Sequence, residues 1–218
     1  MMKRIIYITI TALLLLPSDI MAYDEGDFQI WHTENQDVKV RKKTKLILEE
    51  QFRYGDLASE LYYQHYDAGL LYSLTDNLDV SANYRQIYEL KKGDFEPEYR
   101  PHINATVKWG IPAIKFEDRN RFEYRFFNDK PSSVHYRNQL TVKFPLEVKN
   151  MKFEPYVADE IFASMDPVAL TRNRMYIGLT FDLTKNIKPK IYYLLQSTKS
   201  SGRWNDANVL GLSLKLDF

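Results

Sequence analysis

The chain has 218 residues, with 30 Lys and Arg against 29 Asp and Glu, and it contains no cysteine. The balanced charge argues against a nucleic-acid-binding protein, which needs a basic excess. The missing cysteine excludes disulfides, thiol catalysis and thiolate metal sites.

The first 22 residues have the layout of a secretory signal peptide. Met1-Met2-Lys3-Arg4 is basic, residues 5–16 (IIYITITALLLL) are apolar, and Ala22 offers a cleavage position. The apolar run is shorter than the roughly 20 residues that a membrane-spanning helix needs. We therefore expect residues 1–22 to be removed on secretion and residues 23–218 to form a single mature domain.

The mature chain predicts one β-strand after another. Apolar and polar residues alternate with the period of two that is typical of strands with two different faces. Eleven segments show this pattern, although 152–163 shows it imperfectly: 27–41, 45–54, 67–74, 78–88, 100–109, 119–126, 135–148, 152–163, 172–183, 187–198 and 207–218. Bacterial barrels have even strand numbers. We therefore expect 27–41 either to split, giving twelve strands, or to lie partly inside the barrel, giving ten.

The connections between these segments differ in length. Short ones fall near 75–77, 110–113, 149–150 and 184–186, and longer polar ones near 55–61, 90–98, 128–133, 164–170 and 199–206. This alternation predicts the short periplasmic turns and longer outer loops of an outer-membrane barrel. Glu50, Asn120 and Asn138 fall on faces that are otherwise apolar, where we expect β-bulges or rim positions.

The last segment, 207–218 (ANVLGLSLKLDF), places four leucines and Phe218 on one face. A soluble sandwich or a lipocalin-like barrel could also end on such a strand. An apolar strand with an aromatic last residue resembles the signal that the outer-membrane assembly machinery reads. The predicted fold class is all-β: an antiparallel transmembrane β-barrel of 10–12 strands in the outer membrane of a Gram-negative bacterium. Its expected partners are outer-membrane lipids and, through Phe218, the assembly machinery.

Short motifs along the chain carry a family resemblance. They are Asp27–Trp31 (DFQIW), Leu48–Arg53 (LEEQFR), Glu98–His102 (EYRPH), Asp118–Phe127 (DRNRFEYRFF), Tyr136–Leu140 (YRNQL), Pro155–Phe162 (PYVADEIF), Arg172–Tyr176 (RNRMY) and Tyr192–Gln196 (YYLLQ). In this order they resemble an uncharacterised bacterial family, filed under a domain of unknown function and grouped with porin-like outer-membrane barrels. The resemblance implies a fold and a location, and it supplies no catalytic residues.

The polar faces of the strands indicate what the interior could do. Arginines dominate them, and the candidates for lining a pore are Arg53, Arg85, Arg100, Arg119, Arg121, Glu123, Arg125, Arg137, Arg172 and Arg174. Rings of arginine favour anion pores, so one hypothesis is a narrow passive channel for small anionic solutes. The alternative is a closed structural or anchoring barrel whose interior is filled by ion pairs, because barrels of about eight strands are just filled by side chains. Neither hypothesis requires a cofactor or a metal.

A third hypothesis, an outer-membrane lipid hydrolase, rests on Ser133 and His135. Residues two apart on a strand point to the same face, so this serine and histidine are expected to be neighbours, as a nucleophile and its base must be. No carboxylate that would orient the histidine can be identified in the sequence. We therefore predict that the protein is not an enzyme.

Overall fold

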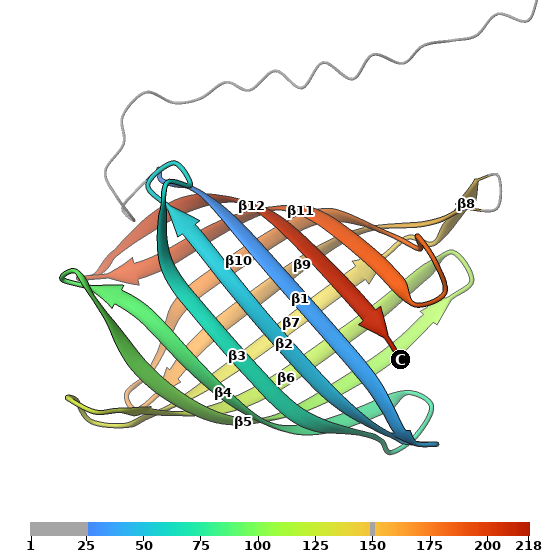
Figure 1. Cartoon of the computed structure of the whole chain (residues 1–218), viewed down its shortest axis with the longest axis horizontal. Helices are drawn as coiled ribbons and strands as arrows, with labels where there is room; N and C mark the ends of the chain where they lie inside the picture. Colours follow the sequence, from blue (N-terminus) through green and yellow to red (C-terminus); the bar gives the residue numbers. More distant parts are fainter. Residues whose placement is uncertain (1–25, 149–150) are drawn as a thin grey trace, which may run out of the picture.

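The computed structural model describes residues 26–148 and 151–218, which form a β-barrel (Figure 1). The strands are β1 (Phe28–Arg41), β2 (Thr44–Gly55), β3 (Glu60–Ser73), β4 (Leu78–Lys91), β5 (Asp94–Ile111), β6 (Ile114–Phe127), β7 (Ser133–Lys143), β8 (Leu146–Val148), β9 (Met151–Met165), β10 (Val168–Phe181), β11 (Ile187–Ser200) and β12 (Arg203–Asp217). The described residues include no helix long and apolar enough to cross a membrane. The predicted signal peptide lies outside the described residues.

Eleven of these strands close the barrel, within the described part of the chain. The short β8 continues the direction of β7 after Phe144-Pro145 and pairs only with β9. All neighbouring pairs are antiparallel except the last, because β1 pairs with β12 in parallel, with Thr33 opposite Ser213. Eleven strands fall within the predicted range of 10–12, but the expectation that 27–41 would split or lie partly inside the barrel is wrong. These residues form a single strand in the barrel wall.

The odd strand number requires this parallel pair. Each hairpin reverses the chain, so after ten reversals the eleventh strand runs in the same direction as the first. As a consequence, Gly26 and Phe218 lie at opposite ends of the barrel, called here the Gly26 end and the Phe218 end. Phe218 completes the seam, since its N–H donates to the carbonyl oxygen of Asp37 at 2.8 Å and its own carbonyl accepts from Lys39 at 2.9 Å.

The predicted sorting of short and long connections is also wrong. Strand bounds leave connections of two to five residues at each end: 42–43, 74–77, 112–113 and 182–186 at the Phe218 end, and 56–59, 92–93, 128–132, 166–167 and 201–202 at the Gly26 end. The predicted turn at 149–150 lies outside the described residues. At Lys92-Gly93 and Ser201-Gly202 both residues have positive φ, which suits a tight two-residue hairpin. The polar residues beside these turns therefore belong to strands.

The two faces of the wall have the opposite polarity to those of a soluble protein. Large apolar side chains such as Ile103 and Ile177, each 60% exposed, cover the outside. Most buried charged groups lie inside, and a smaller apolar cluster around Trp31, Leu194 and Val209 packs against the inner wall. At Gly211 an added Cβ would overlap the ring of Tyr192, so this glycine lets the tyrosine lie against the inner surface of β12.

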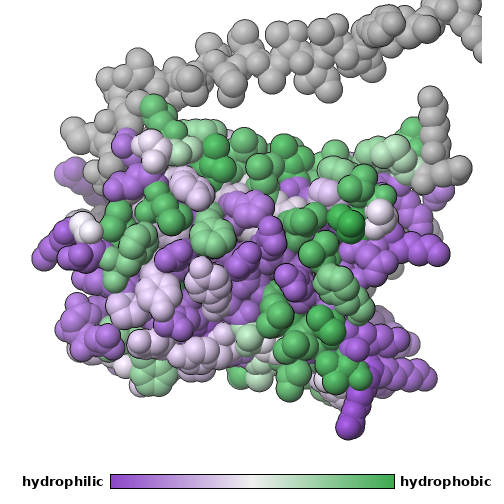
Figure 2. All heavy atoms as spheres, in the orientation of Figure 1, coloured by the Kyte–Doolittle hydropathy of each residue, from purple (hydrophilic) through white to green (hydrophobic). Residues whose placement is uncertain are grey.

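Some polar residues do face outward, and Figure 2 shows polar side chains across the middle of the face formed around β1 to β4. Glu50 lies opposite Glu34 in the β1–β2 register. On β6 and β7 the Asn138 amide donates to Asp118 and to Asn120. Glu50, Asn120 and Asn138 are not at β-bulges, contrary to expectation, because the register shifts fall elsewhere. Mutual hydrogen bonds satisfy the asparagines instead.

Candidate functional site in the barrel interior

The barrel interior contains three cavities in series between its ends. The first, at the Gly26 end, has a volume of about 340 Å³, the middle one about 300 Å³, and the third, at the Phe218 end, about 500 Å³. Arg53, Arg137 and Arg174 line both the first and the middle cavity, and Arg85 lines all three. Arginine side chains therefore form the partition between the first two cavities.

Cations outnumber carboxylates in each cavity. Eight Lys or Arg face three Glu in the first cavity, eight face three in the middle one, and seven face five Asp or Glu in the third. All ten residues that the sequence nominated as pore-lining candidates border one or more of these cavities. Each of them lies on the polar face of a strand with period two, and this face points into the barrel.

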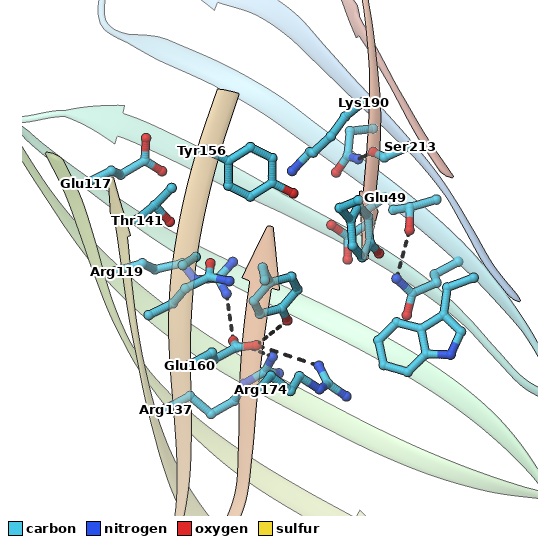
Figure 3. Close-up of a pocket in the computed structure, with 18 of the residues that line it drawn as sticks. Glu49, Glu117, Arg119, Arg137, Thr141, Tyr156, Glu160, Arg174, Lys190 and Ser213 are labelled. Carbon is cyan, nitrogen blue, oxygen red and sulfur yellow. Dashed lines mark hydrogen bonds and ion pairs between the residues drawn. The ribbon is translucent and has the colours of Figure 1, made fainter. Parts of the chain in front are cut away.

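Glu160 is the centre of the largest ion-pair cluster. It is 1% exposed on β9, in the middle cavity. Its Oε1 accepts from Arg119 at 2.9 Å and from Arg137 at 2.7 Å. Its Oε2 accepts from the Tyr176 hydroxyl at 2.8 Å and lies 3.6 Å from Arg174 Nη1. Figure 3 shows Arg137 and Arg174 beside this carboxylate. A single buried anion thus neutralises charge from three other strands, β6, β7 and β10.

A second cluster joins β5, β6 and β7 beside the first cavity. Glu98 holds Arg125 in a two-bond fork, at 2.7 Å from Nε and 2.6 Å from Nη2, and also accepts from Arg100 at 2.6 Å. Glu123 accepts from Arg100 at 3.1 Å and from Arg137 at 2.9 Å. Since forked pairs of this kind are the stronger class of ion pair, these carboxylates fix the arginines against the wall.

A third cluster lies on β2 to β5. Arg85 donates to Asp67 at 2.7 Å and to Glu49 at 2.8 Å. His102 Nε2 lies 2.8 Å from Asp67, and His65 Nε2 lies 2.9 Å from Glu49. Both histidines are therefore buried members of this cluster.

Two of the predicted arginines differ from the rest, because neither has a carboxylate partner among the described residues. Arg53 donates Nε to Gln51 Oε1 at 2.6 Å, and its guanidinium carbon lies 3.8 Å from the Trp31 ring centroid and 4.0 Å from that of Tyr63. Arg172 donates Nε to the Thr198 hydroxyl at 3.1 Å. Both face the first cavity.

Lys190 is a similar cation at the other side of the middle cavity. Its ammonium lies 5.3 Å from the Tyr156 ring centroid and 5.9 Å from that of Tyr192, and Figure 3 shows it close to Tyr156. It lines both the middle and the third cavity. Lys190 was not among the residues predicted from the sequence. Its position on β11, two residues before the inward-facing Tyr192, would have predicted that it faces inward, because residues two apart on a strand share a face.

Glu160 was missed for a different reason. Its segment, 154–163, alternates poorly because the outward-facing Asp159 is charged as well. The Asp159 carboxylate accepts from Asn173 at 2.7 Å on the outer face. The neighbouring Tyr156 and Ala158 are buried on the inner side. Two adjacent acids on a strand point to opposite faces, and the tertiary structure assigns Glu160 to the inside.

The Ser133 and His135 side chains are neighbours, as predicted. Ser133 Oγ lies 3.1 Å from His135 Nε2, and His135 lines the first cavity. A catalytic histidine also needs a group that orients its second ring nitrogen. In the described ranges, no hydrogen bond joins His135 to a carboxylate.

The comparisons with known proteins agree with this architecture. Residues 28–208 match the model of a family described as "Protein of unknown function (DUF2490)". The chain belongs to this family. The match spans every strand but the end of β12, so the DUF2490 region and the barrel are nearly the same segment. No curated protein shows significant similarity to the chain.

Among solved structures, the barrel is similar to the beta domain of the Bordetella autotransporter BrkA. The two share 8% sequence identity, with a TM-score of 0.54 over 84% of this chain and 87% of that one. At this identity the likeness concerns the fold alone. It supports an outer-membrane-type β-barrel, as the sequence predicted.

Proposed function

We propose that this DUF2490 protein resides in the outer membrane of a Gram-negative bacterium and acts there as a narrow, arginine-lined passive path for small anionic solutes. The main support for this proposal is the excess of cations over carboxylates in all three cavities. Interior charge of one sign concentrates counter-ions, and rings of arginine or lysine favour anions. Outer-membrane lipids would surround the apolar wall, and the strand ending at Phe218 would be read by the assembly machinery.

A closed structural or anchoring barrel is the second candidate. The Glu160 cluster and the arginine partition between the first two cavities favour it, because paired charges at mid-barrel narrow the passage. Both candidates are non-enzymatic, since the Ser133–His135 pair has no orienting carboxylate in the part of the chain that the structure describes. Turnover of labelled phospholipid or lipopolysaccharide by the purified barrel would contradict this view.

The channel is tested by conductance in planar lipid bilayers. We expect stepwise, anion-selective currents from the wild-type barrel. Replacing Lys190 with glutamate should move the reversal potential toward cation selectivity, because it inverts a charge at the junction of two cavities. Lys185→Glu, in the turn 182–186 outside the cavities, is the matched control and should leave selectivity unchanged. A folded barrel without current would contradict the channel and favour the closed barrel.

A further inference from the structure

The first cavity contains two guanidiniums that form no hydrogen bond or salt bridge with a carboxylate among the described residues, although Glu89 acts on Arg172 at longer range. Arg53 enters from β2 and Arg172 from β10, and both line the cavity at the Gly26 end. Together with Arg174 they lie close enough to repel one another electrostatically. Their hydrogen-bond partners, Gln51 and Thr198, are neutral. Arginine remains charged in any protein environment, so this repulsion cannot be relieved by loss of a proton.

An unpaired charge in a largely enclosed interior is unfavourable unless a partner of opposite sign is present. The neighbouring Arg137 shows the usual solution, because it donates to both Glu123 and Glu160. Contact of Arg53 with the faces of Trp31 and Tyr63 offsets part of its cost. Arg172 has only a longer contact, with its guanidinium carbon 5.6 Å from the Phe162 centroid. Arg53 and Arg172 therefore still call for a partner of opposite charge.

We propose that the first cavity is a binding site for a small oxyanion, with Arg53 and Arg172 as its principal ligands. This deepens the proposed function, but it holds whether or not the barrel conducts. The planar guanidinium fork matches carboxylate and phosphate oxygens, which it binds through two parallel hydrogen bonds. Since each arginine uses Nε for a neutral protein partner, the terminal nitrogens are left to face the solute. A volume of about 340 Å³ admits only a small molecule.

Guanidiniums cover two of the three aromatic side chains that line this cavity, Tyr63 and Phe162, and this favours recognition of the charged group of the solute over stacking on a sugar ring. Tyr63 is covered by Arg53 at 4.0 Å. Phe162 is contacted by Arg137 at 4.3 Å and by Arg174 at 4.7 Å. Their faces are thus occupied by guanidiniums and are not available for stacking on a ring. These contacts also hold the arginines in place before a ligand arrives, which reduces the entropic cost of binding.

Trp31 provides a direct optical probe of this site. It is 1% exposed, and its ring contacts Arg53 at 3.8 Å and Arg174 at 4.7 Å. The chain has three tryptophans, so Trp109→Phe together with Trp204→Phe leaves Trp31 as the sole emitter. Citrate, inorganic phosphate and sulfate would be titrated into the folded full-length barrel at constant ionic strength. We expect a saturable change in Trp31 emission, confirmed by calorimetry.

The arginine variants decide whether the site is the one proposed. Arg172→Gln should weaken binding by about tenfold, because it removes a charge-assisted contact, and Arg53→Gln should do the same by calorimetry. Arg172→Lys keeps the charge without the fork and should restore binding only in part. Arg41→Gln, an exposed residue at the Phe218 end, is the matched control. A difference in gel migration between heated and unheated samples checks that each variant is folded.

The outcomes separate this site from the channel. Saturation by citrate alone identifies a carboxylate ligand, and saturation by phosphate or sulfate identifies a tetrahedral oxyanion. Binding by a barrel that carries no current leaves the site in place and removes the channel. No saturable response to any of the three anions, or equal affinity in wild type, Arg53→Gln and Arg172→Gln, would overturn the site even in a conducting barrel.

Discussion

Replacing Glu160 with glutamine is expected to lower the free energy of unfolding by about 3–5 kcal/mol, the range for removing one partner from a buried ion pair. The carboxylate is 1% exposed and neutralises Arg119 and Arg137 directly. Glutamine keeps the shape but not the charge, so the surrounding arginines would repel one another without a counter-ion. The measurement is urea unfolding of the barrel in lipid vesicles, followed by tryptophan fluorescence.

Asp159→Asn is the matched control for this variant. Asp159 is adjacent in the chain and carries the same charge, but it faces outward and accepts one hydrogen bond from Asn173. We expect its effect to remain within about 0.5 kcal/mol, as for most surface changes. Equal stability of Glu160→Gln and wild type would show that the interior arginines do not depend on this carboxylate.

A disulfide placed across the seam is expected to form almost completely. The natural chain has no cysteine, so Thr33→Cys with Ser213→Cys introduces the only two thiols. These residues are opposite one another in the parallel β1–β12 register, within the distance that a disulfide spans. The measurement is the shift in gel migration of the folded, oxidised barrel with and without reductant.

The control pair is Thr33→Cys with Val209→Cys. Val209 lies four residues before Ser213 on the same strand, which is roughly 13 Å away along the strand axis, beyond disulfide reach. We therefore expect no cross-link in this pair. If the Thr33–Ser213 pair stayed reduced while the control oxidised, the parallel register would be wrong and the barrel would have to close in another way.

Closure of the barrel by eleven strands also limits the space available for charged side chains in the interior. An eleven-stranded wall lies between barrels that side chains fill and barrels with an open channel. The three cavities, separated partly by arginines, are the expected result of this intermediate size. Both the proposed anion path and the proposed oxyanion site depend on the small number of carboxylates in this limited space. Arg53 and Arg172 are the two predicted arginines that no carboxylate contacts directly among the described residues.

Most of the barrel wall could be predicted from the local sequence pattern. Every alternating segment contains a strand, including 27–41 and the irregular 152–163, although 135–148 is divided into β7 and β8. All ten residues nominated as pore-lining candidates border an interior cavity. Their inward position follows from a local rule with a period of two, so the side of the wall on which Arg121 or Arg174 lies can be predicted from its immediate neighbours in the sequence.

The features that join distant segments could be seen only in the folded barrel. The parallel pairing of β1 with β12 depends on the number of reversals between them and on closure of the sheet, and neither is encoded near residue 28 or residue 217. The lengths of the connections depended on backbone geometry, such as positive φ at Lys92-Gly93, rather than on polarity. The distinction between Arg137, which carboxylates contact, and Arg172, which no carboxylate contacts directly among the described residues, required all strands in place, because their possible partners lie on other strands. Local pattern fixes the face of a residue, and closure of the barrel fixes its neighbours across the interior.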